Sequence, residues 1–214
     1  MIILPLYYQV ARGESALTAG LLMAPQGLGA AMAMPLAGRF TDRVGGGRVA
    51  VVGLVILTLG TIPFAFLKAD TSYTLLALLL VVRGLGIGSA MMPAMAAAYA
   101  TLESSAVPRA TSALNVLQRI GGSLGTALLA VVLQGQITDR LGGGATLEAI
   151  PADELARAAD PLAAAFASTF WWAIGMSVLA LAPATILAVT ERRERREQRG
   201  QAERDAVGPE TLAV

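Results

Sequence analysis

The chain has neither cysteine nor histidine, and it is poor in charged and aromatic side chains. Only 14% of its 214 residues are charged, against roughly 25% in an ordinary soluble domain. Without thiols or imidazoles, disulfides, thiol nucleophiles and the usual zinc ligands are missing. These absences argue against a zinc or haem protein, a Ser-His-Asp hydrolase and a cysteine enzyme, and we expect no metal site.

The charge balance gives no reason to expect a charged partner. The chain carries 16 Lys and Arg residues against 15 Asp and Glu residues, a net charge of +1. Because binding to nucleic acid requires an excess of basic residues, we predict no nucleic acid partner. In contrast, 55% of the residues are hydrophobic and the mean hydropathy is +0.63, which indicates that the chain lies in a lipid bilayer.

Long apolar segments separated by short charged ones predict an all-α, polytopic membrane protein. Each segment is close to the roughly 20 residues that a helix needs to cross the bilayer. Residues 1–10 are apolar but too short to span, and they lack the features of a signal peptide, so we expect them to end a partial first helix. An outer loop is expected at 135–165 and a charged tail at 191–214. The predicted spans are 16–38, 49–67, 74–100, 110–134 and 166–190.

The basic residues predict the orientation of the chain, because Lys and Arg beside a span are retained in the cytoplasm. With the segment 39–48 inside, ten of the 16 basic residues fall on the cytoplasmic side and four outside, so we expect a cytoplasmic C-terminus. Aromatic rings favour the membrane interface, although they also fill cores. Those near the predicted outer boundaries are Tyr7, Tyr8, Phe64, Phe66, Tyr73, Phe166, Phe170, Trp171 and Trp172.

A segment rich in glycine and charge, residues 38–48, joins the first two full spans. A tight turn between helices needs glycine where φ is positive. Asp42 is placed to cap one helix and to pair with an arginine of the next, and such a contact can break and reform as helices shift. A purely connecting role remains the alternative. The residues we assign to a conformational switch are Gly38, Asp42, Arg43, Gly45 and Arg48.

Arg83 lies roughly 15 Å into its span from the outer end. A central arginine costs about 2.5 to 3.5 kcal/mol on the insertion scale, so its side chain is expected to face the bundle interior or a wet cavity. Gly84 and Gly88 beside it form Gly-x-x-x-Gly, which lets a neighbouring helix approach closely. Arg83 is therefore a candidate for the substrate path, with bonding to helix carbonyls as the alternative.

The fourth full span carries a stripe of polar residues. Asn115, Gln118 and Arg119 recur at steps of three and four residues, which places them on one side of the helix. That side is the best candidate for lining a substrate path. Gly121 and Gly125 beside it repeat the Gly-x-x-x-Gly spacing and predict close packing against a partner helix.

Gln26 is a further polar residue within a span, and Pro25 and Gly27 flank it. This arrangement is typical of a bent, hydrated point in a membrane helix. An interhelical hydrogen bond without a role in transport is the alternative. The candidates for the substrate path are thus Gln26, Arg83, Asn115, Gln118 and Arg119.

All 15 acidic residues fall outside the predicted spans, in loops or tails. Because histidine is absent too, no side chain in the spans carries a proton near neutral pH. Any proton coupling would therefore need carboxylates from outside these spans.

The pattern Gly38-x-x-x-Asp42-Arg43-x-Gly45, followed by the basic Arg48, resembles the cytoplasmic-loop signature of the major facilitator superfamily. The chain departs from the usual signature at Gly46 and Gly47, where basic residues are expected. Other segments resemble the C-terminal half of the fourteen-helix drug:proton antiporters. They are Leu4-Pro-Leu-Tyr-Tyr-Gln-Val10, Ala19-Gly-Leu-Leu-Met-Ala-Pro25, Arg83-Gly-Leu-Gly-Ile-Gly88 and Asn115-Val-Leu-Gln-Arg-Ile-Gly-Gly-Ser-Leu-Gly125.

This resemblance implies the C-terminal six-helix half of such a transporter, with its first helix incomplete, in a bacterial-type plasma membrane. It implies proton-coupled efflux of amphipathic, often cationic, small molecules by alternating access once the missing N-terminal half is present. It implies no cofactor, only a proton gradient, with the titrating carboxylates in the missing half.

Two other classes of function compete with this interpretation. One is a truncated interaction protein that assembles with another transporter half and has no transport activity alone. The other is an intramembrane enzyme, which we do not expect. Ser89 and Ser123 have no histidine to activate them, and the lone lysine, Lys68, falls at a span boundary.

Overall fold

The structure is a computed structural model that describes residues 3–99, 102–141 and 158–206. These ranges are mostly helical and contain no strand, which confirms the all-α prediction. Five helical segments are long and apolar enough to cross a membrane, as predicted. They are Ala16–Val44, Gly46–Phe66, Tyr73–Ala96, Val107–Leu141 and Ala159–Arg193.

Short helical pieces precede and separate the long helices. In chain order the elements are α1 (Ile3–Leu6), the π-helix η1 (Tyr7–Ala11), α2 (Ala16–Leu22), α3 (Ala24–Val44), α4 (Gly46–Thr61), the 3₁₀ helix η2 (Ile62–Phe66), α5 (Tyr73–Tyr99), α6 (Val107–Leu141) and α8 (Ala159–Ala206).

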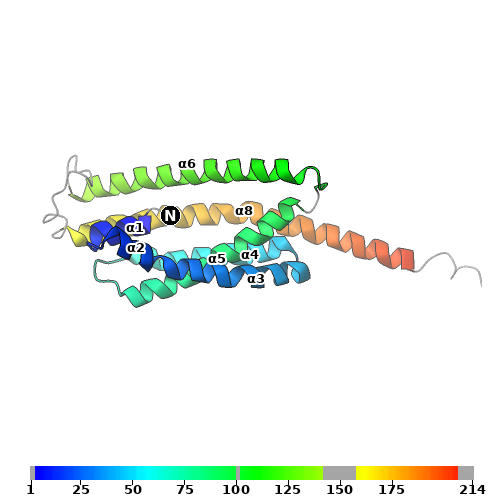
Figure 1. The fold of residues 1–214 in the computed structure, drawn as a ribbon, viewed down its shortest axis with the longest axis horizontal. Helices are drawn as coiled ribbons and strands as arrows, with labels where there is room; N and C mark the ends of the chain where they lie inside the picture. Colours follow the sequence, from blue (N-terminus) through cyan, green and yellow to red (C-terminus); the bar gives the residue numbers. More distant parts are fainter. Residues whose placement is uncertain (1–2, 100–101, 142–157, 207–214) are drawn as a thin grey trace, which may run out of the picture.

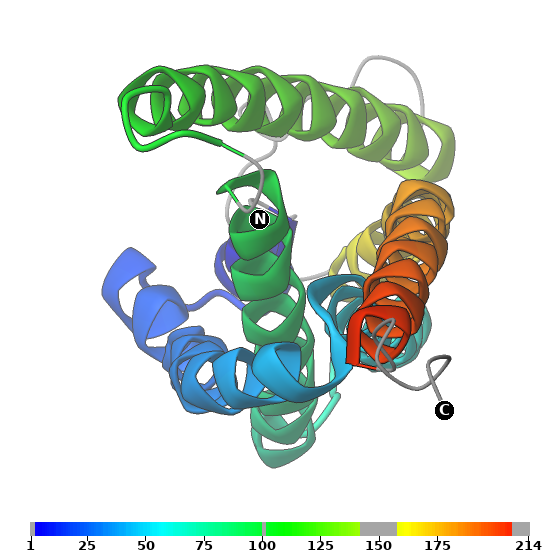
Figure 2. The same cartoon turned by 90° about the vertical axis from the view of Figure 1, so that its right-hand side faces the viewer.

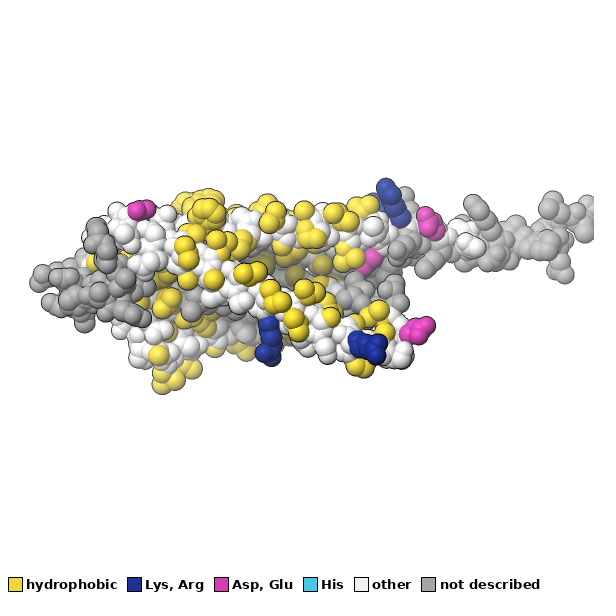
Figure 3. Space-filling view, turned by 90° about the horizontal axis from the view of Figure 1, so that it is seen from above, with side chains coloured by type: hydrophobic (Ala, Val, Ile, Leu, Met, Phe, Trp, Pro, Cys, Tyr) yellow, Lys and Arg dark blue, Asp and Glu magenta, His cyan; other side chains and the backbone are white. Residues whose placement is uncertain are grey.

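The long helices lie side by side, with α8 between α6 and the group of α3, α4 and α5 in the view of Figure 1. The helix α5 packs along α3 and α4, and α4 also contacts α8. In contrast, α6 stands at the edge of the bundle and packs chiefly against α8 (Figure 2). On the face shown in Figure 3, hydrophobic side chains cover the central part, and most charged ones lie toward one end, as expected for a membrane bundle.

Local sequence explains where the helices begin and end. The Ser15 hydroxyl accepts the backbone N–H of Thr18 at 3.1 Å, which caps the N-terminus of α2. The break between α2 and α3 falls at Met23, just before Pro25, whose nitrogen has no hydrogen to donate. Gly45 ends α3 with a φ of 95°, a conformation that favours glycine.

Several helices run further than the predicted spans. The helix α3 continues to Val44 through most of the expected inner loop, and α6 and α8 enter the expected outer loop from both sides. Hydropathy marks the apolar thickness of the bilayer, whereas backbone hydrogen bonds carry a helix beyond it. The middle of the outer loop, 142–157, and the end of the tail, 207–214, lie outside the described residues.

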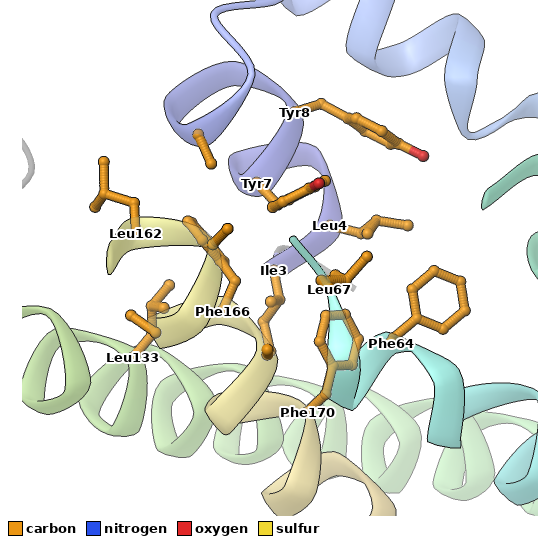
Figure 4. Packing of buried hydrophobic residues seen from close by; sticks show 14 of the residues in the cluster. Ile3, Leu4, Tyr7, Tyr8, Phe64, Leu67, Leu133, Leu162, Phe166 and Phe170 are labelled. Atoms are coloured by element: carbon orange, nitrogen blue, oxygen red, sulfur yellow. The ribbon is translucent and has the colours of Figure 1, made fainter. Parts of the chain in front are cut away.

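The hydrophobic core is concentrated at one end of the bundle, which we call the aromatic end and define by Tyr7, Phe64, Phe166 and Phe170 (Figure 4). The Tyr7 and Phe166 rings meet edge to face at 5.9 Å between centroids, and those of Phe64 and Phe170 lie 5.4 Å apart. These four side chains are at most 2% exposed, so they fill the core and do not face an interface. Trp171 and Trp172, about half exposed, remain suited to the membrane boundary.

Candidate functional site

A cavity of about 520 Å³ lies between α4, α5, α6 and α8. It is found toward the end of the bundle opposite the aromatic end, which we call the turn end because Gly45 joins α3 to α4 there. Small-molecule pockets have volumes of roughly 300–1,000 Å³, so the cavity is large enough for a drug-sized compound. Its lining includes Leu54, Ile87, Met91, Met95, Gln118 and Ala184.

Among the described residues, the lining is apolar apart from one polar side chain, that of Gln118 on α6. The Gln118 amide both donates and accepts hydrogen bonds. Met91 and Met95 on α5 are flexible and polarizable, which allows a pocket to adapt to ligands of different shape. The cavity is therefore suited to an amphipathic compound with a mainly apolar body.

Glycines hold three of the helices close together beside this cavity. On α5, Gly84 lies against the Gln26 carbonyl of α3, and a Cβ at Gly88 would come within 2.5 Å of the Ala30 carbonyl oxygen. On α4, a Cβ at Gly53 would lie 2.5 Å from the backbone nitrogen of Ala90. The close approach that the sequence predicts for Gly84 and Gly88 is thus present, and α3 is the partner helix.

The second glycine pair has a different environment. No atom outside the local helix lies within 4 Å of a Cβ built at Gly121 or Gly125. The close packing predicted from this spacing therefore does not occur within the described chain. The same spacing gives two outcomes because Gly-x-x-x-Gly only permits an approach, and no described helix comes within that distance of these positions on α6.

Of the predicted substrate-path residues, Gln118 is the one that lines the cavity. Asn115 and Arg119 are exposed on α6, and each residue along a helix turns by about 100°, which carries Arg119 away from Gln118. Gln26 is buried at 7% exposure where α3 meets α5. The structure does not gather the five candidates into one site.

Arg83 occupies the same side of α5 as Ile87, one helical turn closer to the aromatic end. Its side chain is partly buried, and its Nε atom is buried without a hydrogen-bond partner among the described residues. The residue therefore places a poorly compensated positive charge next to the cavity, within the apolar part of the bundle.

At the turn end, the last helix supplies the carboxylate that contacts the turn. The backbone N–H of Gly47 donates to Oε2 of Glu191 at 2.8 Å, which places a negative charge at the N-terminus of α4. Gly47 also packs against the backbone of Ala188, and a Cβ at Gly46 would lie 3.2 Å from the Pro93 carbonyl oxygen. The helices α4, α5 and α8 therefore meet at this turn.

The residues predicted to form a conformational switch in this segment do not form the hydrogen bond with Glu191. Asp42 is an exposed residue of the last turn of α3, and it forms no hydrogen bond or ion pair with another described residue. Arg43 and Arg48 are exposed as well, and Gly38 lies within α3. Sequence reasoning missed Glu191, whose signal was its place directly after the apolar part of the last span.

Polar contacts tie the loops of the aromatic end together. Arg12 Nη1 donates to the Thr71 carbonyl oxygen at 2.8 Å, and its Cζ atom lies 4.3 Å from the centroid of the Tyr73 ring. The Tyr73 hydroxyl donates to Oε1 of Glu14 at 2.5 Å. Burial alone lowers the pKa of Arg12, but its contacts with Tyr73 and Tyr7 outweigh burial and raise the pKa above the ordinary value, so Arg12 is a cation.

Comparison with known proteins provides an independent line of evidence. The profile of the Major Facilitator Superfamily matches residues 1–212. A protein of Mycobacterium tuberculosis named "Multidrug resistance protein B homolog" is 37% identical over 134 residues, which are 62% of this chain and 25% of that protein. The transporter YcnB of Bacillus subtilis is 38% identical over 63% of this chain and 28% of its own length. The lincomycin resistance protein LmrB of Listeria innocua is 29% identical over 62% of this chain and 28% of its own length.

The aligned part of the chain thus spans only about a quarter of each of these relatives. It lies within their C-terminal half.

Proposed function

Because the chain belongs to the Major Facilitator Superfamily of membrane transporters, we propose that it forms one half of a transporter that exports amphipathic small molecules by alternating access. The observation that carries this proposal is the cavity between α4, α5, α6 and α8, with its aliphatic lining and the single amide of Gln118. The printed names of the relatives, which include multidrug and lincomycin resistance proteins, support export of drug-like compounds. No catalytic role is part of the proposal.

The other half would complete the transporter. Rocking of two halves around a central site requires both of them, and the relatives that match this chain are much longer than the matched part. Their further residues would supply the second wall of the substrate path. We propose the plasma membrane as the site of action, with the C-terminus in the cytoplasm.

Proton coupling is proposed on the same basis. The apolar parts of the spans contain no carboxylate and no histidine, so exchange for protons would use carboxylates of the other half. The chain described in this structure would then provide the substrate-binding wall and not the proton-binding groups.

Competing with export is a purely assembling role, in which the chain binds another transporter half without moving a substrate. Exposed apolar side chains on α3 and α6, among them Leu28, Met32, Leu117 and Leu124, favour contact with lipid or with further helices. These side chains suit either role, so the test must report on the cavity itself.

The test is a pair of alanine-to-tryptophan substitutions on α8, introduced at the chromosomal locus of the source cells. This design keeps any other polypeptide or segment that completes the transporter. Ala184 lines the cavity, whereas Ala182, two residues earlier on the same helix, is exposed and does not. Ala184→Trp should raise the cellular accumulation of a fluorescent amphiphile to the level of a deletion strain, and Ala182→Trp should leave it at the wild-type level.

Equal protein levels of both variants in the membrane fraction provide the control. If deletion of the gene leaves accumulation unchanged for a panel of amphiphiles, the export function is wrong and the assembling role gains support. If the deletion matters but both variants behave like wild type, the assignment of the cavity is wrong.

A further inference from the structure

The described lining of the cavity lacks the negative charge that would favour a bound cation. None of the described residues that line the cavity is acidic, and the polar group that Gln118 contributes is neutral. A cation that leaves water for this cavity would lose its hydration without gaining a counter-charge from the lining.

The nearest central charge is positive. Arg83 and Arg119 are the charged residues in the middle of the spans, while the carboxylates of Asp42, Asp139 and Asp160 lie within terminal turns of α3, α6 and α8. The Glu191 carboxylate lies one turn beyond Leu187 of the lining, at the turn end, where it accepts the Gly47 N–H. Arg83 lies one turn from Ile87 of the lining, and its buried Nε lacks a hydrogen-bond partner among the described residues. The backbone of Arg83 is thus about 5.4 Å along the helix axis from that of Ile87, and a charge acts over a longer range in a medium of low dielectric constant than in water.

From this arrangement we infer that the cavity selects amphiphiles by charge. It takes compounds with an apolar body and an uncharged or anionic polar group, and it disfavours cationic ones. Gln118 provides the hydrogen bond to the polar group, and Arg83 provides the positive potential. This inference rests on the proposed function, and it differs from the preference for cations that the family resemblance implied.

The test uses three probes with the same dansyl-hexyl body, ending in a carboxamide, a sulfonate or a trimethylammonium group. Their binding is measured by fluorescence anisotropy with the transporter that contains this chain, purified from membranes of the source cells and placed in nanodiscs of zwitterionic lipid, and the signal of empty nanodiscs is subtracted. The carboxamide and the sulfonate should bind at least about tenfold more tightly than the ammonium probe.

Substitutions of Gln118 sharpen the test, because its side chain is exposed toward the cavity and little packing is lost. Gln118→Glu adds a negative charge and should abolish or reverse the preference, whereas Gln118→Leu should weaken binding of the three probes without changing their order. Arg83→Gln should lower the preference for the sulfonate at least about threefold, and Arg83→Lys should retain it.

The outcomes separate this inference from the proposed function. If the ammonium probe binds as tightly as the others, and Ala184→Trp but not Ala182→Trp blocks it, the cavity binds amphiphiles and the charge selection is wrong. If Ala184→Trp has no effect on any probe, or none binds above empty nanodiscs, the cavity is not the binding site and both proposals fail.

Discussion

Glycine residues with the same sequence spacing have different roles in this bundle. Gly84 and Gly88 lie directly against the backbone of α3, where a side chain has no room. Gly121 and Gly125 face open space. In both pairs the spacing places the two glycines on one face of their helix. The pairs differ only in whether a neighbouring helix packs against that face.

Paired substitutions test this difference directly. Gly84→Ala should destabilise the chain by about 1 to 3 kcal/mol, because the added methyl group would overlap the Gln26 carbonyl and α3 must move. Gly121→Ala should be neutral or should stabilise the chain by up to about 1 kcal/mol, since alanine favours a helix and meets no atom. The measurement is unfolding of the detergent-solubilised chain by SDS titration. Equal effects of the two substitutions would contradict the packing described for α5.

At the scale of elements, α8 is the longest helix, with 48 residues. Its apolar part packs on α4 and α6, and it continues past the other helices toward the C-terminus (Figure 1). Glu191 lies where the apolar part ends, and its carboxylate accepts the N–H of Gly47 in the first turn of α4. Because an N–H in the first turn has no partner within its own helix, an external carboxylate stabilises the helix terminus.

Removal of this contact should loosen the turn end. Glu191→Ala should cost about 1 kcal/mol and should speed hydrogen exchange at the Gly47 amide, because that N–H loses its acceptor. Glu191→Gln retains a carbonyl acceptor without the charge, so its exchange rate at Gly47 should lie between those of the wild type and Glu191→Ala. Glu197→Ala, at an exposed position of the same helix, is the matched control and should leave the exchange unchanged. Unchanged protection in Glu191→Ala would disprove the capping contact.

For the whole molecule, the central expectation is that the turn end lies in the cytoplasm and the aromatic end outside. The absence of native cysteine makes this expectation easy to examine, since every thiol is introduced by design. Asp42 at the turn end and Asp70 at the aromatic end are both exposed, so replacement should not disturb packing.

In intact cells, Asp70→Cys should react with a membrane-impermeant maleimide, whereas Asp42→Cys should react only after the membrane is opened. The physical reason is the retention of arginine-rich segments in the cytoplasm. Reaction of Asp42→Cys alone in intact cells would reverse the orientation, and reaction of both would contradict an odd number of spans between them.

The number and type of spans were predictable from sequence, because about 20 apolar residues in a row have few alternatives to a membrane helix. The ends of α3, α6 and α8 were not, since hydropathy does not report how far a helix extends into water. Of the residues that line the candidate site, sequence reasoning identified one, Gln118. Its aliphatic neighbours, such as Leu54 and Met91, resemble ordinary packing residues until the helices are assembled.

The sequence by itself determined that this chain spans the membrane, that its spans carry no titrating acid, and that Arg83 must lie in the interior. These properties follow from the transfer free energies of individual side chains, which depend little on neighbours. Only the tertiary structure decided which glycines are packed, which carboxylate caps α4, and where the cavity lies. Such properties depend on the approach of segments far apart in the chain, as between Gly47 and Glu191, and no local pattern records which segments meet.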